Sequence, residues 1–442
     1  MKHSRVTPRR PSGFPEYTPA QQLAFNKFLA SIRQSYELAG FGPIETPALE
    51  LAEVLLAKGG GETEQEVFRF GKGSKDYVMH YDLTVPLARY VTEHQNELVF
   101  PFRRSQLQKV WRAERAQKGR AREFYQCDAD IVGEADVAVD GELIALAAST
   151  VRALNVGEFT VRLNNRKILT GLYESLGIAD KAIDLLRIID KLEKIGEAEV
   201  RELLAAQGLS AADADRLLAT VSLHGSVEVV INQLRKLEKM NTTFVTGLEE
   251  LERTAVAAYA AGVKPSELEV DCSIARGLDY YTSTVFETVM TDMPELGSVC
   301  SGGRFDDLAQ YYTDRSLPGV GISIGLTRLF DGLLSVNKVD LSQVSPSRVI
   351  IVAMIEEAWG PAGQLASGLR AEGISCELVL SETKLGTVFS RADKLKVPFV
   401  AVIGEQELAA KTVALKNMTS GEQTTVAWDE VKGLVSNTSI VS

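Results

Sequence analysis

Basic side chains gather in one part of the sequence, where eight lysines and arginines between Arg103 and Arg122 stand against a single acid, Glu114. A planar guanidinium can donate to two phosphate oxygens at once, and alternate residues of a strand project from one face. A charge run usually covers a solvated face, but Val110 and Trp111 interrupt this one. The pattern therefore favours a hairpin with a basic, phosphate-binding loop over a solvated helix.

A second stretch combines an arginine with two tyrosines, in the sequence ARGLDYYTSTVFE. Arg276 precedes a glycine, whose missing Cβ lets the backbone approach a ligand closely. Tyr280 and Tyr281 follow it. Taken singly, these tyrosines also fit an amphipathic strand entered through a glycine turn, and Arg276 also fits an ion pair with Asp279. Both structural alternatives stay open for the individual residues.

Two polar residues of the strand that follows the basic loop are spaced to act together. Gln126 and Asp130 are four residues apart, so they share one face of an extended strand. A polar face turned to solvent is the alternative. Ile131 and Val132 then lead the chain into a core, which favours a binding role for the pair.

Composition excludes several classes of protein. The 442 residues are 45% hydrophobic with a net charge of −11, which argues against bulk, non-specific binding of nucleic acid while leaving room for a local basic patch. No apolar run reaches membrane-spanning length, and the basic N-terminus lacks the apolar core of a secretory signal. Four cysteines and four histidines are scattered, which predicts reduced thiols, a cytoplasmic location and no structural zinc site.

The elements that must position these residues follow from periodicity and turn signals. Thr18 to Gln21 forms a capping box with proline at the first helical position, and Gly40 is placed to end that helix. Residues 77–82 predict a strand, and Thr84 to Pro86 predicts the start of a helix. Residues 169–262 predict amphipathic helices. Beyond residue 348, apolar runs alternate with helical patterns, which predicts a small α/β domain with a mostly parallel sheet.

Together these stretches resemble the histidyl-tRNA synthetases, a family of class II aminoacyl-tRNA synthetases. Residues 275–287 are similar to the histidine-binding motif of that family nearly letter for letter. Residues 107–133 resemble motif 2, residues 319–333 resemble motif 3 with Arg328 as its arginine, and Pro47 would be the proline of motif 1. Residues 300–308 resemble a second histidine-specific block, for which a tight glycine turn is the alternative.

Some positions depart from the usual pattern of the family. His80 stands where an arginine is expected, and Ser301 and Asp307 replace glycines. Thr327 occupies a position where glutamate is frequent, and Asp130 is shorter than the glutamate of many relatives.

The resemblance implies an α+β fold: a class II antiparallel sheet with helices, a helical insertion and a C-terminal α/β anticodon-binding domain. The implied boundaries divide the chain into five parts. These are a first half of the catalytic core (1–166), the helical insertion (167–262), a second half of the core (263–335), a linker (336–347) and the anticodon-binding domain (348–442).

The implied activity is the ATP-dependent ligation of L-histidine to tRNA(His) through a histidyl-adenylate, with ATP and Mg²⁺. A homodimer without membrane association is implied as well. By resemblance, Arg276 and Arg112 are catalytic and hold the α-phosphate, and Glu114, Arg120 and Arg328 join Arg112 in binding ATP. Gln117 and Lys118 would contact the acceptor end of the tRNA.

By resemblance, histidine binds through six residues: Asp82, Thr84, Gln126, Asp130, Tyr280 and Tyr281. Asp82, Thr84 and Gln126 would accept from the amino group, whereas Asp130 and Tyr281 would bind the imidazole. No protein side chain is assigned to a metal. Two alternatives remain, namely a non-catalytic paralogue that acts as a regulatory subunit in histidine biosynthesis and a synthetase for another amino acid.

Overall fold

The computed structural model describes residues 6–57, 66–114, 120–189, 195–237, 241–274, 280–380 and 384–436. The chain forms two compact units, one of Met1–Pro15 with Phe28–Lys338 and the other of Glu16–Lys27 with Val339–Ser442. The boundary near residue 338 falls within the stretch that the sequence predicts as a linker. None of the described helices is long and apolar enough to cross a membrane.

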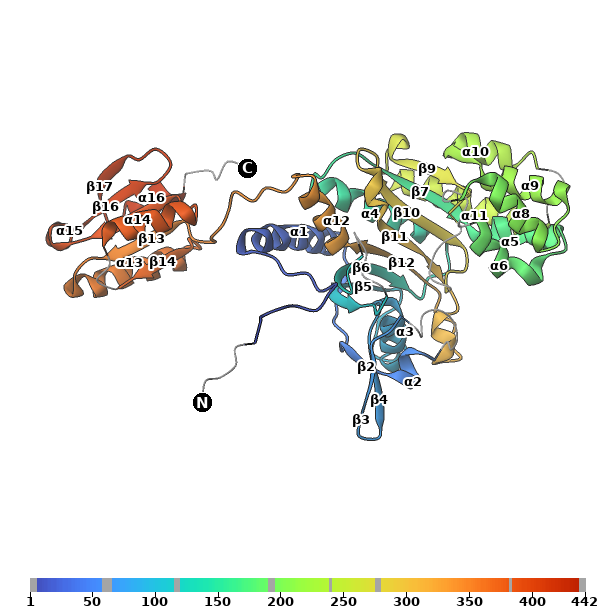
Figure 1. Ribbon diagram of the computed structural model, residues 1–442, viewed down its shortest axis with the longest axis horizontal. Coiled ribbons are helices and arrows are strands. Elements are labelled where there is room, and N and C mark those ends of the chain that lie inside the picture. The colour runs from blue at the N-terminus through green and yellow to red at the C-terminus, as the bar shows by residue number, and fades with distance from the viewer. Residues whose placement is uncertain are drawn as a thin grey trace. The chain divides into compact units, whose positions relative to one another are not determined.

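A nine-stranded sheet forms the centre of the first unit (Figure 1). In order across the sheet the strands are β1 (Gly42–Pro43), β5 (Phe102–Trp111), β6 (Glu123–Val132), β12 (Gly319–Gly325), β11 (Ser298–Phe305), β10 (Thr284–Met290), β7 (Phe159–Asn165), β9 (Leu268–Asp271) and β8 (His224–Ser226). The β1–β5 and β7–β9 pairs are parallel, and the other neighbours are antiparallel. The predicted antiparallel sheet is thus present, with two parallel pairings.

The predicted hairpin of basic residues is confirmed by the pairing of β5 with β6. Its register places Arg104 opposite Asp130, Gln106 opposite Asp128 and Gln108 opposite Gln126. Because side chains alternate along a strand, these six polar residues lie on one face of the sheet. Cys127, Ala129 and Ile131 project from the other face and are fully buried.

Helices cover the apolar face of the sheet. Helix α1 (Pro19–Leu38) begins where predicted, with the Thr18 amide donating to Oε1 of Gln21 at 2.9 Å. Near its end, the hydroxyl of Tyr36 donates to the carbonyl of Cys127 at 2.8 Å. Helix α4 (Ala138–Leu154) contacts β12, and α12 (Leu326–Ser335) contacts β6. The polar face is therefore the one that remains for a site.

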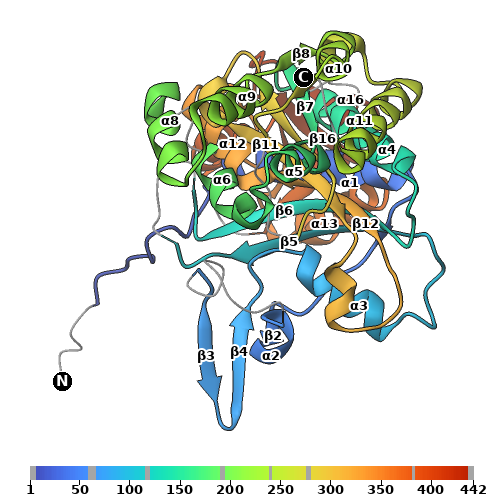
Figure 2. The same cartoon turned by 90° about the vertical axis from the view of Figure 1, so that its right-hand side faces the viewer.

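A small three-stranded sheet lies beside the hairpin, in the order β2 (Leu49–Leu51), β4 (Lys75–Met79) and β3 (Arg69–Lys72) (Figure 2). Helices α2 (Ala52–Leu55) and α3 (Thr84–Glu93) share an apolar core with it. Strand β4 ends before His80, which makes it shorter than the predicted strand. The helix predicted at Thr84 is confirmed.

Residues 166–260 form most of the remaining helices, namely α5 (Arg166–Ser175), α6 (Ala182–Ile189), α8 (Glu197–Ala206), α9 (Ala211–Val221), α10 (Val227–Leu234) and α11 (Thr242–Ala260). The prediction of helices alone was wrong at residues 224–226, which form the edge strand β8 of the main sheet. This three-residue strand carries no periodic signal and is defined by its pairing with β9.

The second unit contains a five-stranded sheet, in the order β14 (Cys376–Val379), β13 (Val349–Ala353), β15 (Phe399–Ile403), β16 (Thr412–Asn417) and β17 (Gln423–Ala427). Its helices are α13 (Trp359–Ala371), α14 (Leu385–Lys394), α15 (Glu405–Ala410) and α16 (Val431–Ser436). The prediction of a mostly parallel sheet needs correction, because β16 and β17 are antiparallel to their neighbours. A tight turn closed by the Gly421 amide on the Asn417 carbonyl joins them, which forces the antiparallel direction.

Candidate active site

The polar face of the β5–β6 hairpin carries a buried cluster of charges. Arg104 is fully buried, and Asp128 and Asp130 are each 2% exposed. One guanidinium nitrogen, Nη2 of Arg104, lies 2.9 Å from Oδ2 of Asp130 and 3.8 Å from Oδ2 of Asp128. The same nitrogen donates to the carbonyl of Leu83 at 3.2 Å. One arginine thus joins two acids of β6 to the turn that precedes α3.

Burial dominates the protonation of both acids. It raises the pKa of Asp128 and of Asp130, whereas the charge of Arg104 lowers both. The negative charges of Asp128 and Asp82 raise the pKa of Asp130 further, because like charges repel one another in a medium of low dielectric constant. The pair therefore holds protons more tightly than two exposed aspartates would.

A third acid, Asp82, reaches the same region from the turn before α3. Its Oδ1 accepts from the Val85 amide in the first turn of α3 at 3.2 Å, and its Oδ2 accepts from the Tyr280 hydroxyl at 3.3 Å. Burial raises the pKa of Asp82 to about 6, although the Val85 amide and Arg112 lower it. Asp82 thus also holds the first turn of α3, in addition to the role as a ligand for the substrate amino group that the resemblance implies.

Two glycines make room for the side chains expected to bind the ring. A Cβ on Gly321 would lie 2.0 Å from Oδ1 of Asp130, and a Cβ on Gly303 would lie 2.7 Å from Cδ1 of Tyr281. Gly303 is within strand β11, so the alternative of a tight turn for residues 300–308 was wrong. Burial raises the pKa of Tyr281, and the charges of Asp128 and Asp130 add to that effect.

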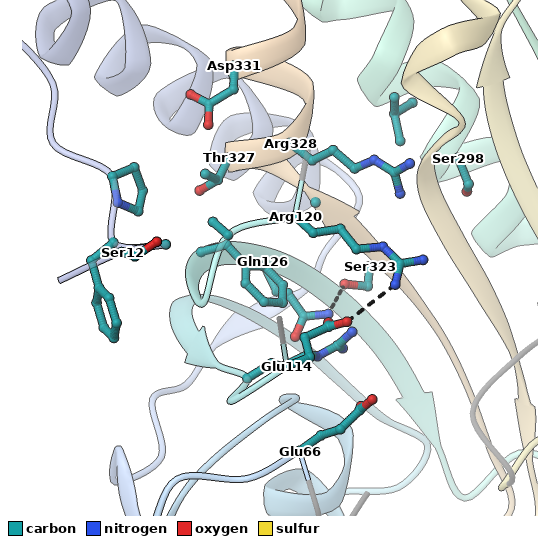
Figure 3. A pocket seen from close by; sticks show the side chains of 18 of the residues that line it. Ser12, Glu66, Glu114, Arg120, Gln126, Ser298, Ser323, Thr327, Arg328 and Asp331 are labelled. Carbon is teal, nitrogen blue, oxygen red and sulfur yellow. Dashed lines mark hydrogen bonds and ion pairs between the residues drawn. The ribbon is translucent and has the colours of Figure 1, made fainter. Parts of the chain in front are cut away.

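The other end of the site is lined by arginines (Figure 3). Nε of Arg112 donates to the Tyr81 carbonyl at 3.1 Å, and its guanidinium carbon lies 5.2 Å from the centre of the Phe124 ring. Arg120 donates to Oε2 of Glu114 at 3.3 Å. Burial lowers the pKa of Arg328, and the positive charge of Arg120 lowers it further. Two guanidinium groups held this close favour an anion between them.

The two ends belong to one cleft. Two adjoining cavities, of about 860 and about 840 Å³, share the lining residues Arg112, Arg120, Gln126, Ser298, Ser301, Ser323 and Arg328. The first also includes Glu114 and a wall formed by residues 10–15, and the second includes Asp82, Thr84 and Tyr281. Gln126 lies at the junction, where its Nε2 donates to Oγ of Ser323 at 2.8 Å (Figure 3).

Most residues predicted for the site come together in this cleft. The histidine-binding set lies at the acidic end, namely Asp82, Thr84, Gln126, Asp130, Tyr280 and Tyr281. The ATP-binding set lies at the basic end, namely Arg112, Glu114, Arg120 and Arg328. The predictions for Arg276, Gln117 and Lys118 lie outside the described residues.

Arg104 and Asp128 were not identified from the sequence pattern. Asp128 lies between Gln126 and Asp130 at the same period of two, so the alternation that selected its neighbours could also have found it. For Arg104, no signal separated it from the neighbouring basic residues, because only the register with β6 places it against the acids.

Two of the positions that depart from the family pattern have structural partners. Nε2 of His80 lies 2.7 Å from the carbonyl of Lys109, and its ring centre is 5.4 Å from that of Trp111. Burial lowers the pKa of His80, so the ring is neutral near pH 7. Oγ1 of Thr327 accepts from the amide of Tyr125 at 2.9 Å and thus ties α12 to β6.

Comparison with known proteins gives a consistent result over nearly the whole chain. A family model for histidyl-tRNA synthetase matches residues 13–329, and a model for the anticodon binding domain matches residues 348–438. The chain is 44% identical to the histidine–tRNA ligase of Clostridium tetani, over 99% of this chain and 100% of that protein. It is 42% identical to the ligase of Xanthomonas campestris pv. campestris, over 96% of this chain and 95% of that protein.

Solved structures show the same similarity. Histidyl-tRNA synthetase from Nostoc sp. PCC 7120 superposes with a TM-score of 0.88 at 37% identity, covering 98% of this chain and 99% of that one. An ATP phosphoribosyltransferase regulatory subunit/histidyl-tRNA synthetase from Bacillus halodurans superposes with a TM-score of 0.75 at 23% identity, covering 88% of this chain and 97% of that one. The second likeness concerns the fold alone.

Proposed function

The chain belongs to the histidyl-tRNA synthetase family, and from that membership we propose how its cleft divides the work of attaching histidine to tRNA. The chain is a ligase that joins histidine to its tRNA at the expense of ATP, as predicted. The α+β fold with a C-terminal anticodon-binding domain is confirmed as well. One observation supports our assignment of the residues: a single cleft brings two buried acids, Asp82 and Asp130, together with three arginines, Arg112, Arg120 and Arg328.

In the first step, the carboxylate of histidine attacks the α-phosphorus of ATP, and pyrophosphate leaves. This reaction needs positioning and positive charge more than covalent help. We assign the outer phosphates to Arg120 and Arg328, whose mutual repulsion a phosphate would relieve. Arg112 lines both cavities and is assigned to the α-phosphate together with Arg276.

At the acidic end, we assign the imidazole ring to Asp130 and Tyr281. The substrate amino group is an ammonium with three donors, and Asp82, Thr84 and Gln126 offer oxygen acceptors near it. Oε1 of Gln126 is buried and accepts no hydrogen bond from any described residue, which suits an acceptor reserved for the substrate.

In the second step, a ribose hydroxyl of the terminal tRNA nucleotide attacks the carbonyl carbon of the adenylate, and AMP leaves. Gln117 and Lys118 are proposed to contact the acceptor end, on the strength of the basic loop and the family resemblance. Phosphate contacts of this kind predict a tRNA KM that rises with salt concentration.

Magnesium is proposed to enter with ATP. Mg²⁺ is usually held by one or two carboxylates together with substrate phosphates. Among the described residues, no group of three His, Cys, Asp or Glu side chains could hold a metal by itself. Glu114, at the basic end of the cleft, would supply the single carboxylate that an ion held mainly by phosphates requires. The ion would supply positive charge to the leaving pyrophosphate.

We further propose a cytoplasmic homodimer that assembles through the segment around Pro47. Leu49 and Phe70 of the small sheet are 44% and 43% exposed, which suits an interface. The boundaries predicted for the helical insertion and the two halves of the core remain part of the proposal. Light scattering of the purified chain should give twice the monomer mass, and a monomer mass would contradict the proposed dimer.

The assignment is tested by measuring the exchange of pyrophosphate into ATP in the presence of each of the twenty amino acids. Exchange with histidine alone is expected.

Gln117→Ala should retain exchange and impair transfer to tRNA, whereas unchanged transfer would remove Gln117 from the acceptor contact. The regulatory-subunit alternative is less supported, since relatives at 41–44% identity are ligases. If the wild-type chain shows no histidine-dependent pyrophosphate exchange, the result would support the regulatory-subunit alternative instead.

A further inference from the structure

The main chain of Tyr281, Thr282 and Ser283, which leads into strand β10, is held from both sides. On one side, the Arg166 amide donates to the Ser283 carbonyl at 2.9 Å, and Nη1 of Arg166 donates to the Tyr281 carbonyl at 2.7 Å. On the other side, the Thr282 amide donates to the Arg304 carbonyl at 2.8 Å. Arg166 directly follows β7 and Arg304 belongs to β11, so the two strands that flank β10 also hold the residues before it.

Arg166 is itself placed by the junction between β7 and α5. It is the first residue of α5, and the side-chain oxygen of Asn165 before it accepts from the Lys167 amide at 3.0 Å and so caps the helix. Nδ2 of Asn165 donates to Oε2 of Glu250 on α11 at 2.9 Å, and Nζ of Lys167 donates to the other oxygen of that carboxylate. Because both neighbours of Arg166 are tied to one carboxylate, the backbone from which its side chain starts is fixed.

The opposite side is anchored by a buried ion pair. Arg304 is 2% exposed, and its guanidinium donates to both carboxylate oxygens of Asp140 on α4. Its Nη1 donates to Oδ1 of Asp306 at 3.3 Å, and Oδ2 of Asp306 accepts from the Thr282 hydroxyl at 2.6 Å. Thr282 is thus held through its main chain and its side chain, whereas the carbonyl of Tyr281 is held by Arg166.

The ring of Tyr281 is enclosed on two sides. Its centre lies 5.0 Å from that of the Tyr280 ring, in an edge-to-face arrangement. At Gly303, a Cβ would lie 2.7 Å from Cδ1 of Tyr281, so the ring occupies the space that a side chain would take. An aromatic side chain has only two rotatable bonds, so once its ring is packed, the position of its hydroxyl depends on the main chain. A small shift of that main chain would weaken any hydrogen bond of the hydroxyl to a ligand.

We propose that Arg166 is a positioning residue that fixes the hydroxyl of Tyr281 against the ring of bound histidine. This inference rests on the proposed assignment of the ring to Tyr281. A guanidinium suits the task, because its hydrogen bonds are charge-assisted and its planar form fixes their direction. Arg166 lines neither cavity of the cleft, so its influence on histidine passes through the main chain that it holds.

A double-mutant cycle tests whether Arg166 acts through Tyr281. Histidine KM and ATP KM should be measured by pyrophosphate exchange in the wild type, Arg166→Met, Tyr281→Phe and the double variant. Arg166→Met should raise the histidine KM about tenfold, a typical effect of losing one hydrogen bond to a charged group, and change the ATP KM about twofold or less. In the Tyr281→Phe background the same substitution should raise the histidine KM about twofold or less, because the hydroxyl that Arg166 positions is absent.

Arg152→Met is the matched control. Arg152 on α4 donates to the two carboxylate oxygens of Glu267 at 3.2 and 2.6 Å and lines neither cavity. Its substitution removes a guanidinium from the same unit, so a general loss of stability should leave both KM values unchanged. Should Arg166→Met fail to fold, Arg166→Gln takes its place in the cycle, because its shorter side chain is polar but ends before the position of the guanidinium.

The outcomes separate this inference from the proposed function. An equal rise of the histidine KM in both Tyr281 backgrounds would overturn the inference, as would no rise in Arg166→Met or an equal rise of the ATP KM. A wild-type histidine KM in Tyr281→Phe would overturn the assignment of the ring to Tyr281 and the inference with it. Absence of histidine-dependent exchange in the wild type would instead overturn the proposed function.

Discussion

The two ends of the cleft, which we propose bind different substrates of one reaction, are built in opposite ways. At the acidic end, Asp82 and Asp130 are 1% and 2% exposed, and Arg104 beneath them is fully buried. At the basic end, the side chain of Arg120 is 57% exposed and that of its partner Glu114 is 20% exposed. The charged side chains of the acidic end are thus packed in the interior of the protein, whereas those of the basic end lie near solvent.

This difference matches what each ligand requires. A small polar side chain can be distinguished only by hydrogen bonds that are expensive to leave unmade, and such bonds must be buried. Triphosphate carries a large charge that attracts arginines even from solvent, and exposed groups are screened by salt. We therefore expect substitutions at the acidic end to change the affinity for histidine, and substitutions at the basic end to change the affinity for ATP in a salt-dependent way.

The largest effect is expected at the junction of the two ends, where Arg276 is proposed to hold the α-phosphate. Losing one preorganised donor to a developing charge typically reduces a rate about 10²- to 10³-fold. Arg276→Ala should reduce histidine-dependent pyrophosphate exchange by that amount while the melting temperature stays near that of the wild type. A lower melting temperature with little loss of rate would mean that Arg276 forms a structural ion pair.

A smaller effect is expected at the acidic end. Asp130→Ala removes an acceptor of a charged hydrogen bond, for which about 1.5–3 kcal/mol is typical, or about 10- to 100-fold in affinity. The histidine KM should rise by this factor with the ATP KM nearly unchanged. Equal losses for both ligands would erase the distinction between the two ends. Gly321→Ala offers an independent test, because its Cβ would collide with Oδ1 of Asp130.

At the basic end, Arg328→Ala should raise the ATP KM about tenfold, which corresponds to about 1.4 kcal/mol. Because Arg120 remains and both arginines lie near solvent, the loss should shrink as salt is added. Titration of exchange activity with ATP at two salt concentrations measures this, with histidine KM as the internal control. If the rise in the ATP KM were independent of salt concentration, the arginines of the basic end would be as well shielded from solvent as the acids of the acidic end.

The smallest effect concerns stability. The pKa of Asp82 is raised to about 6, so the folded protein holds this proton more tightly than the unfolded chain does. The free energy of unfolding therefore falls as pH rises from about 4 to about 6, and the loss remains above that range. Asp82→Asn should stabilise the ligand-free protein by about 1 kcal/mol at pH 7.5, with no gain at pH 4.

Thermal unfolding at both pH values measures this gain. The same variant should bind histidine weakly. The carboxylate of Asp82 would then be kept for binding histidine although it lowers the stability of the ligand-free protein. A variant that is less stable at pH 7.5 would show that the hydrogen bonds of Asp82 to Val85 and Tyr280 outweigh the burial of its charge.

The sequence by itself determined the features that depend on near neighbours in the chain. The capping signal at Thr18 predicted the start of α1, and alternation along residues 123–132 placed Gln126 and Asp130 on one face. The motif resemblance supplied the family and the residues for the two ends of the cleft. Each of these signals is contained in a few consecutive positions, because helical and strand periods repeat over 3.6 and two residues.

Only the tertiary structure decided how distant segments meet. Arg104 became the partner of Asp128 and Asp130 through the register of β5 against β6. The need for glycine at positions 303 and 321 comes from neighbouring segments, whose side chains occupy the space that a Cβ would take. The edge strand β8 and the antiparallel direction of β16 likewise depend on pairing. Register and close approach are set by which strands lie side by side, and a single strand contains no record of its neighbours.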